Sequence, residues 1–296
     1  MGTYFVEQLI NGICQGSIYA LNAIGYAIIV GIVGVVNFAY GDVVMFGAFG
    51  AYYGAMIFGN NLLLGLLVGF VTSAVLGVVV QRICVGHFVN GAGSSGGVPL
   101  LCLISMSMIL RSLAQVLFGP EYKPYPEFIA QKTFQVGPVR ITLLQVLIIG
   151  IVVTLCIALS LFLRTRRGLM LRAIRLNKTA AALTGINVQR MTSVGCFLGY
   201  GVAGLSGVLL GMYYGLLSPL IGTSYGMKAF SSAALGGMTD IPASAIGGAI
   251  IGILENLGVM VISATYKDMV AFCFLIIVLL MKPTGFKFSF RRRKKA

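Results

Sequence analysis

The sequence predicts an all-α integral membrane protein with about eight or nine membrane segments, one of them broken or re-entrant. Two features of the composition support this fold class. Hydrophobic residues make up 58% of the chain, charged residues only 9%, and the mean hydropathy is +0.97, whereas a soluble domain is about 25% charged. The chain also contains 40 glycines, and spacings such as Gly12/Gly16 and Gly248/Gly252 let helices approach closely in a bilayer.

About eight segments are apolar enough to be spanning helices, which need about 20 mostly apolar residues. They are 7–32, 40–58, 62–80, 99–117, 141–163, 191–216, 241–262 and 270–281. The last of them is short by this standard. A further stretch, 218–237, is interrupted by Lys228 and by several Ser and Gly residues, so its hydropathy alone does not identify a span.

Clusters of basic residues indicate which parts of the chain face the cytoplasm. Of the 21 Lys and Arg residues, seven lie in 164–190 and seven in the tail 282–296. Because positively charged loops stay in the cytoplasm, we expect a cytoplasmic coupling loop at 164–190, a basic cytoplasmic tail at 282–296 and an external loop at 118–140. Both basic regions can lie on one side only if 218–237 supplies one more crossing, as a short or re-entrant segment. The chain 1–296 is then a single transmembrane domain.

The composition and the motifs argue against several classes of function. The net charge of +14 would suggest nucleic-acid binding in a soluble protein, but here topology and anionic lipid account for it. The six cysteines are scattered without a C-x-x-C pair, which indicates neither a metal site nor a disulfide framework. The G-x-G-x-x-G match at 91–96 lacks the strand and the acidic residue of a dinucleotide site. No catalytic constellation is visible, so we expect a non-enzyme without a cofactor of its own.

Polar residues at membrane depth are candidates for a solute path. Ionisable groups there face the bundle interior or a cavity, because exposure to lipid is costly. Glu255 and Asn256 are adjacent in an otherwise apolar segment, and GVVNFAYGD at 34–42 breaks the pattern between two spans. The candidate path residues are Asn22, Asn37, Tyr40, Asp42, Glu255 and Asn256. The alternative is that each one makes interhelical hydrogen bonds that fix the packing.

The basic loop contains a short helical pattern with small side chains on one face. The residues at i, i+3 and i+4 spacing are Ala173, Asn177, Ala180, Ala181 and Thr184. Gly185 suits the position after a helix end, where a left-handed conformation is favoured. Since a short helix is marginal alone in water, the pattern predicts either a docking helix held by a partner or an ordinary amphipathic surface helix.

Two long blocks of the sequence resemble a known family. They are GSIYALNAIGYAIIVGIVGVVNFAYGDVVMFGAF at 16–49 and RGLMLRAIRLNKTAAALTGINVQRMTSVGCFLGYGVAGLSGVLLGMYYG at 167–215. Both are similar to the permease subunits of branched-chain amino acid ABC transporters, and the chain most resembles the smaller of the two permeases. The resemblance continues through GGAIIGILE at 247–255 and KPTGF at 282–286, and it weakens in the external loop.

The resemblance implies a polytopic ABC importer permease in the bacterial cytoplasmic (inner) membrane. It implies four partners: a second homologous permease, two cytoplasmic ATPase subunits that bind the ATP and Mg²⁺, and an extracytoplasmic solute-binding protein. Membrane lipid surrounds the assembly. The residues that match the family's ATPase-coupling segment are Gly168, Arg172, Ala173, Asn177, Ala181 and Gly185.

Three alternatives remain open from the sequence. The same machinery could import another small solute, such as urea or an amide, a sugar or a nucleoside. The chain could also be an ATP-independent channel or carrier. An intramembrane enzyme is the third alternative, against which the lack of a catalytic constellation argues.

Overall fold

The computed structural model describes residues 2–86, 97–129, 133–136, 139–260 and 266–281. Twelve helices and four short strands are formed by these residues. The helices are α1 (Gly2–Val33), α2 (Tyr40–Phe58), α3 (Leu62–Gln81), η1 (Arg82–Gly86), α5 (Gly97–Phe118), α6 (Leu143–Phe162), α7 (Arg166–Leu176), α8 (Lys178–Leu183), α9 (Val188–Tyr214), α10 (Ile221–Leu235), α11 (Ile241–Gly258) and α12 (Lys267–Met281). The strands are β1 (Lys123–Pro124), β2 (Thr133–Val136), β3 (Val139–Thr142) and β4 (Leu216–Leu217). The basic tail and the glycine-rich motif at 91–96 lie outside the described residues.

The polytopic helical fold expected from the sequence is confirmed. Within the described part of the chain, seven helices are long and apolar enough to cross a membrane: α1, α2, α3 with η1, α5, α6, α9 and α11. The two remaining expected segments are 15-residue helices, α10 and α12. Helix α10 occupies the interrupted stretch 218–237 and is largely buried against α1, α2 and α11, as a short segment inside a bundle should be.

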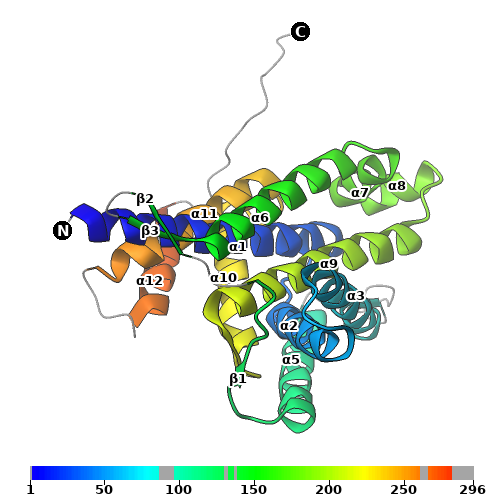
Figure 1. Ribbon diagram of the computed structural model, residues 1–296. Coiled ribbons are helices and arrows are strands. Elements are labelled where there is room, and N and C mark those ends of the chain that lie inside the picture. Colours follow the sequence, from blue (N-terminus) through cyan, green and yellow to red (C-terminus); the bar gives the residue numbers. More distant parts are fainter. Residues whose placement is uncertain (1, 87–96, 130–132, 137–138, 261–265, 282–296) are drawn as a thin grey trace.

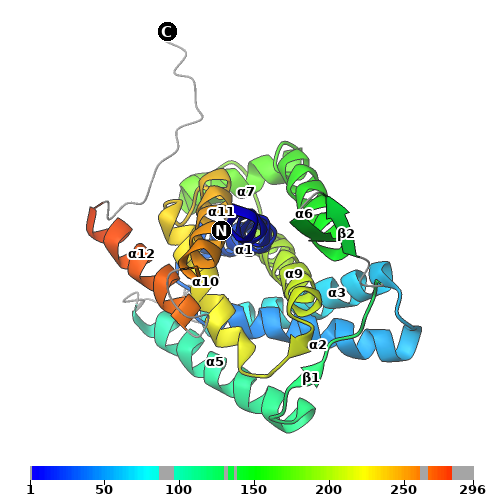
Figure 2. The ribbon, with the colours of Figure 1, turned by 60° about the vertical axis from the view of Figure 1, so that its left-hand side comes forward.

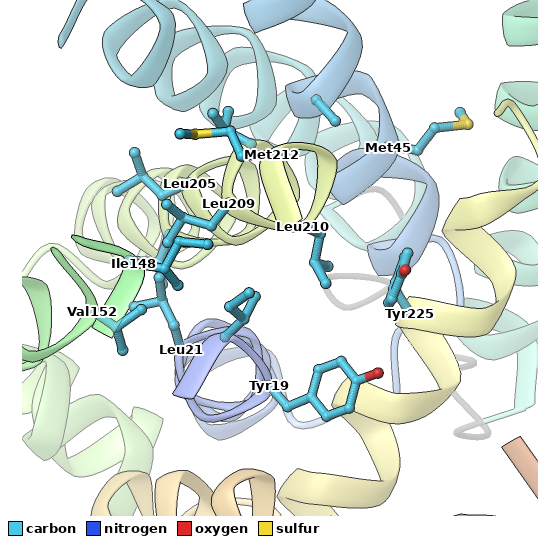
Figure 3. Packing of buried hydrophobic residues seen from close by; sticks show 14 of the residues in the cluster. Tyr19, Leu21, Met45, Ile148, Val152, Leu205, Leu209, Leu210, Met212 and Tyr225 are labelled. Atoms are coloured by element: carbon cyan, nitrogen blue, oxygen red, sulfur yellow. The ribbon is translucent and has the colours of Figure 1, made fainter. Parts of the chain in front are cut away.

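Helix α1 forms the centre of the bundle and packs against α9, α10, α11 and α6. Figure 2 looks almost along α1 and shows these helices around it. The core on one side of α1 is apolar: Leu21 lies beside Ile148 and Val152 of α6 and Leu209 of α9 (Figure 3). These side chains are almost fully buried, so the interface of α1 with α6 and α9 is a continuous hydrophobic core.

Helices α1 and α11 meet through the small residues that the sequence singled out. A Cβ atom at Gly16 would lie 2.7 Å from the carbonyl oxygen of Ala249, and one at Gly12 would lie 3.0 Å from Cα of Ile253. Gly252 in turn faces the backbone of Gly16. The two backbones are therefore in direct contact, as expected for small-xxx-small packing in a bilayer.

Gly16→Val is expected to lower the free energy of unfolding by about 2–3 kcal/mol, because the added side chain must displace backbone. Gly150→Val in α6 is the matched control, since a Cβ there has no neighbour within 4 Å and valine is a better helix former than glycine. Unfolding of the purified variants in mixed micelles measures both. Equal stability of the Gly16 variant and the wild type would contradict the close packing of α1 and α11.

Two helices begin in the middle of the bundle rather than at its surface. After α1 the chain turns back, so that Tyr40 at the start of α2 donates a hydrogen bond to the carbonyl of Asn22, halfway along α1 (2.8 Å). The start of α10 lies against the start of α2, where Gly41 faces Gly222 and Gly226 backbone to backbone. Two positive helix ends therefore meet at the depth of Asn22.

The short strands form two separate pairs, and only β2 and β3 lie at the end of the bundle that holds the N-terminus (Figure 1). Strand β1 pairs antiparallel with β4, and β2 pairs antiparallel with β3. The hairpin β2–β3 lies beside the first turns of α1, and helices α7 and α8 lie at the opposite end (Figure 1). The hairpin β2–β3 and the basic helices α7 and α8 therefore lie at opposite ends of α1.

Candidate functional site

The basic segment forms two helices, not the single short helix that the sequence pattern suggested. Helix α7 ends at Leu176, and Asn177 adopts an extended conformation (φ −160°, ψ 112°). Its side chain accepts a hydrogen bond from the amide of Ala180 (3.0 Å), which starts α8. Asn177 is therefore an N-cap, a position that asparagine favours over a helix interior. The spacing Ala173–Asn177–Ala181 consequently does not form one continuous face.

The residues expected to contact an ATPase divide into inward and outward positions. Gly168 packs against the backbone of Leu163, and Ala181 is only 3% exposed, so both face the bundle. Ala173 is half-buried, whereas Arg172, Asn177 and Gly185 are exposed. Gly185 has the left-handed conformation that was expected after a helix end (φ +82°).

The most exposed apolar residues of this region are two leucines that the sequence pattern did not single out. Leu176 is 86% exposed and Leu183 is 85% exposed. They end α7 and α8, while Leu171 and Ile174 on the opposite side of α7 are buried. Two such leucines among basic side chains, outside the predicted spans, are typical of a protein-contact surface. We refer to Leu176 and Leu183 as the leucine pair.

Two basic side chains tie this helix pair to the spanning helices. Lys178 donates a hydrogen bond to the carbonyl of Val33, the last residue of α1 (3.0 Å). Arg175 donates to the carbonyl of Thr239, just before α11, and its aliphatic part lies against Gly31. Burial lowers the pKa of Lys178 below its ordinary value. A displacement of α7–α8 would therefore pull on the ends of both α1 and α11.

A charge cluster, formed by Lys228, Glu255, Lys267 and Asp268, lies inside the bundle. Lys228 contacts Glu255 at 2.5 Å and Asp268 at 2.8 Å. Lys228 and Glu255 are almost completely buried, while the Asp268 side chain is 50% exposed. The cluster holds two charges of each sign, as buried ions require. It joins α10, α11 and α12.

Neutral polar groups surround the charge cluster and extend it to α1 and α9. The side-chain amide of Gln15 donates to Glu255 (3.2 Å) and to the hydroxyl of Tyr214 (2.6 Å). Its oxygen accepts hydrogen bonds from Asn256 (2.7 Å) and Lys267 (2.5 Å). Gln15 is fully buried and so connects helices that are far apart in the sequence.

A second polar group surrounds the start of α2. Asn22 donates to the carbonyl of Tyr225 (3.2 Å) and accepts from the hydroxyl of Ser206 (3.1 Å). Asn37 contacts the hydroxyl of Tyr200 (2.5 Å), and its backbone amide donates to the hydroxyl of Tyr26 (3.2 Å). These buried bonds hold the returning chain against α1 and α9.

Asp42 belongs to a third polar group, between α2 and α5. Its Oδ2 accepts a hydrogen bond from Ser107, and its Oδ1 lies 3.7 Å from Nε of Arg111. Asp42 is buried, while the Arg111 side chain is 30% exposed. Within the described residues, neither Asp42 Oδ1 nor Arg111 Nε has a hydrogen-bond partner, so this ion pair is incompletely satisfied.

The six candidate path residues thus fall into three separate groups. Asn22, Asn37 and Tyr40 lie together, Asp42 lies with Arg111, and Glu255 and Asn256 lie beside Lys228. All six are buried. Sequence reasoning did not include Ser107, Lys228, Lys267 or Asp268 among the candidates. The interruption of 218–237 by Lys228 was the available signal, because a lysine inside a membrane bundle requires an acidic partner.

The described residues contain no group of three or more His, Cys, Asp and Glu side chains that could hold a metal ion. The interior instead holds paired charges and hydrogen-bonded amides and hydroxyls on the helices α1, α2, α9, α10 and α11. Such groups can offer alternative hydrogen bonds to a polar solute or fix the helices in one arrangement. The geometry described above contains no nucleophile paired with a general base.

Comparison with known proteins gives a consistent result. Residues 8–279 match the family model described as branched-chain amino acid transport system / permease component. The chain is 36% identical over 296 residues to the high-affinity branched-chain amino acid transport system permease protein LivH of Escherichia coli strain K12, with 95% of both chains covered. It is 34% identical to the corresponding protein BraD of Pseudomonas aeruginosa, again with 95% of both covered. The solved structure of PsaBC from Streptococcus pneumoniae in complex with Fab has a TM-score of 0.51 and 13% identity over 96% of this chain and 97% of that chain, which shows the fold alone.

Proposed function

The chain belongs to the permease family of branched-chain amino acid transport systems, and from this premise we propose that it is the membrane subunit of an ATP-driven importer. The solute is a branched-chain, hydrophobic amino acid, as the names of the relatives say of those proteins. A second homologous permease forms the path together with this chain in the bacterial inner membrane. Two cytoplasmic ATPases bind ATP and Mg²⁺ and hydrolyse the ATP, and an extracytoplasmic binding protein delivers the solute.

The observation that carries the proposal is the helix pair α7–α8. The leucine pair is exposed, and the segment 164–190 that contains it has seven basic residues and no acidic residue. Lys178 and Arg175 connect the same helices to α1 and α11. A surface that is apolar, basic and mechanically connected to two spanning helices suits a force-transmitting contact with a separate subunit.

The mechanism that we propose is a rigid-body movement of helices. ATP binding by the ATPases displaces α7–α8, and α1 and α11 follow because their ends are hydrogen-bonded to this pair. Backbone contact at Gly16 makes α1 and α11 move together. The polar groups at the start of α2 and beside Lys228 then exchange partners as the path opens inward. Solute contacts come from Asn22, Asn37, Tyr40, Asp42, Glu255 and Asn256.

Replacing the leucine pair tests the proposal. Leu176→Ser with Leu183→Ser is expected to lower substrate-stimulated ATP hydrolysis by the assembled transporter by roughly tenfold or more, because two apolar contacts with the ATPases are lost. The variant should fold normally, since both side chains are exposed in the free chain. The control, Leu176→Met with Leu183→Met, preserves the apolar area and should retain stimulation. Undiminished stimulation in the serine variant would remove the coupling role from α7–α8.

A further inference from the structure

Two adjoining recesses open where the ends of α3 and η1 meet the start of α9. Their volumes are about 520 Å³ and 500 Å³, and they share Arg82, Gln189 and Ser193 as lining residues. The outer recess also contains Arg190, and the inner recess contains Lys178 of α8. The recesses lie at the end of the bundle that carries α7 and α8, which is the level of a membrane surface.

The positive charge of these recesses has no counter-charge in the chain. Arg82, Arg190 and Lys178 line them, and no acidic residue does. The sequence contains no Asp or Glu in 43–120 or in 128–239, which includes every part of α3, η1, α8 and α9. An anionic ligand in the recesses would therefore meet basic side chains and no acidic one among the described lining residues.

Two further features of the recesses point to a bound headgroup. Gln81, which lines the inner recess, is only 7% exposed, and its side-chain oxygen has no hydrogen-bond partner in the described structure. A ligand hydroxyl could satisfy this oxygen once the Gln81 side chain turns toward the inner recess. The first turn of α9 begins at Val188, where Asn187 caps the amide of Arg190, and the positive end of the helix adds to the potential.

The outer recess continues from polar residues to an apolar surface. Val78, Val194 and Phe197 line it beside the two arginines, and Phe197 is 38% exposed. The neighbouring Val79 of α3 is 46% exposed on the flank of a spanning helix. This order, from basic to apolar along the helix axis, matches a phosphate group with acyl chains below it.

We propose that this site binds an anionic phospholipid with a hydroxylated headgroup, such as phosphatidylglycerol. The phosphate lies between Arg82 and Arg190, a headgroup hydroxyl donates to the oxygen of Gln81, and an acyl chain lies along Val78, Val194 and Phe197. The lipid supplies the negative charge that the chain lacks here, and it connects α3 to the start of α9. The site does not depend on which solute is transported.

The test measures lipid retention by the purified full-length chain in detergent micelles. The chain is exchanged into detergent and incubated with equal amounts of phosphatidylglycerol and phosphatidylcholine. Native mass spectrometry then measures the mass of the chain with its bound lipid. The wild type should retain phosphatidylglycerol preferentially. Arg82→Gln with Arg190→Gln should weaken this retention by about 25-fold, because each basic residue near an anionic lipid contributes a factor of about five. The control, Arg164→Gln with Arg167→Gln, removes two charges from the same end of the bundle. Neither residue lines the recesses.

Competition in the wild-type chain provides a second measurement that does not depend on a variant. Inorganic phosphate at millimolar concentration should leave the lipid bound, because it has no acyl chain to occupy the surface beside Phe197. Displacement by phosphate would identify a free-anion site and overturn the proposal. Equal retention by the recess variant and the control variant would also overturn it.

Discussion

Lys228→Met is expected to lower the free energy of unfolding by about 3–5 kcal/mol, the largest change that we expect of any single substitution in the chain. Lys228 is 3% exposed and contacts both Glu255 and Asp268. Methionine fills nearly the same volume, so the loss comes from charge and not from packing. Without the ammonium group, the carboxylate of Glu255 stays buried beside that of Asp268 with too little positive charge to stabilise it.

The double variant Lys228→Met with Glu255→Leu separates this electrostatic effect from other effects. It removes one charge of each sign and leaves Lys267 and Asp268, which are closer to the surface. Its stability should therefore exceed that of Lys228→Met alone, since replacement of a whole buried ion pair is often tolerated. Unfolding of each purified variant in mixed micelles measures the differences.

Lys123→Met is the control for the loss of a lysine. Lys123 donates a hydrogen bond to the neutral hydroxyl of Tyr53 (3.2 Å), so its removal leaves no buried carboxylate unpaired and should cost only about 1.5 kcal/mol. A Lys228→Met variant as stable as this control would show that the charge cluster is not coupled. The same conclusion would follow if the double variant lost as much free energy of unfolding as Lys228→Met and Glu255→Leu lose in total.

Arg175→Met combined with Lys178→Met is expected to reduce solute uptake by about tenfold or more while ATP hydrolysis by the assembled transporter continues. Each residue donates a charged hydrogen bond to a backbone carbonyl at the end of a spanning helix, and such bonds contribute about 1.5–3 kcal/mol each. The leucine pair remains intact in this variant, so the ATPases should still bind. Movement of α7–α8 would then act on α1 and α11 only through apolar contacts such as those of Leu171 and Ile174, so the displacement should be smaller.

Uptake and ATP hydrolysis, measured together in proteoliposomes that contain the whole transporter, test this uncoupling. Arg140→Met is the matched control, because Arg140 is an exposed basic residue of β3 at the end of the bundle opposite α7 and α8. It should leave the ratio of solute to ATP unchanged. A parallel fall of uptake and hydrolysis in the double variant would mean that Arg175 and Lys178 serve assembly, not transmission.

Most of the helices could be predicted from the sequence, because a spanning helix corresponds to one continuous apolar segment. The expected span 40–58 coincides with α2, and the stretch interrupted by Lys228 contains the short helix α10. Gly16 and Gly252 could also be predicted as packing positions, since their spacing follows the helix repeat.

The partners of the polar residues could not be predicted in the same way. Glu255 is 27 positions from Lys228, and Gln15 is 240 positions from Glu255, so no local period connects them. Asn177 was placed inside a helix on spacing alone, although its preference for N-cap positions was a contrary signal. The exposure of Leu176 and Leu183 depends on which side of α7–α8 packs against the bundle. The pattern of residue types alone does not determine which side that is.

The meeting of the starts of α2 and α10 has a consequence for ion leakage. Each helix start carries about half a positive charge, and Gly41 and Gly222 bring the two together backbone to backbone, with a carboxylate oxygen of Asp42 beside Gly222. Asp42 lies in the first turn of α2 and offsets part of this charge, and Arg111 in turn offsets part of Asp42, so we expect a residual positive potential inside the bundle. Such a potential repels protons and sodium ions. For a zwitterion with no net charge, the electrostatic free-energy cost of crossing the same region is small. The peptide backbone itself thereby helps to preserve the membrane potential while solute crosses.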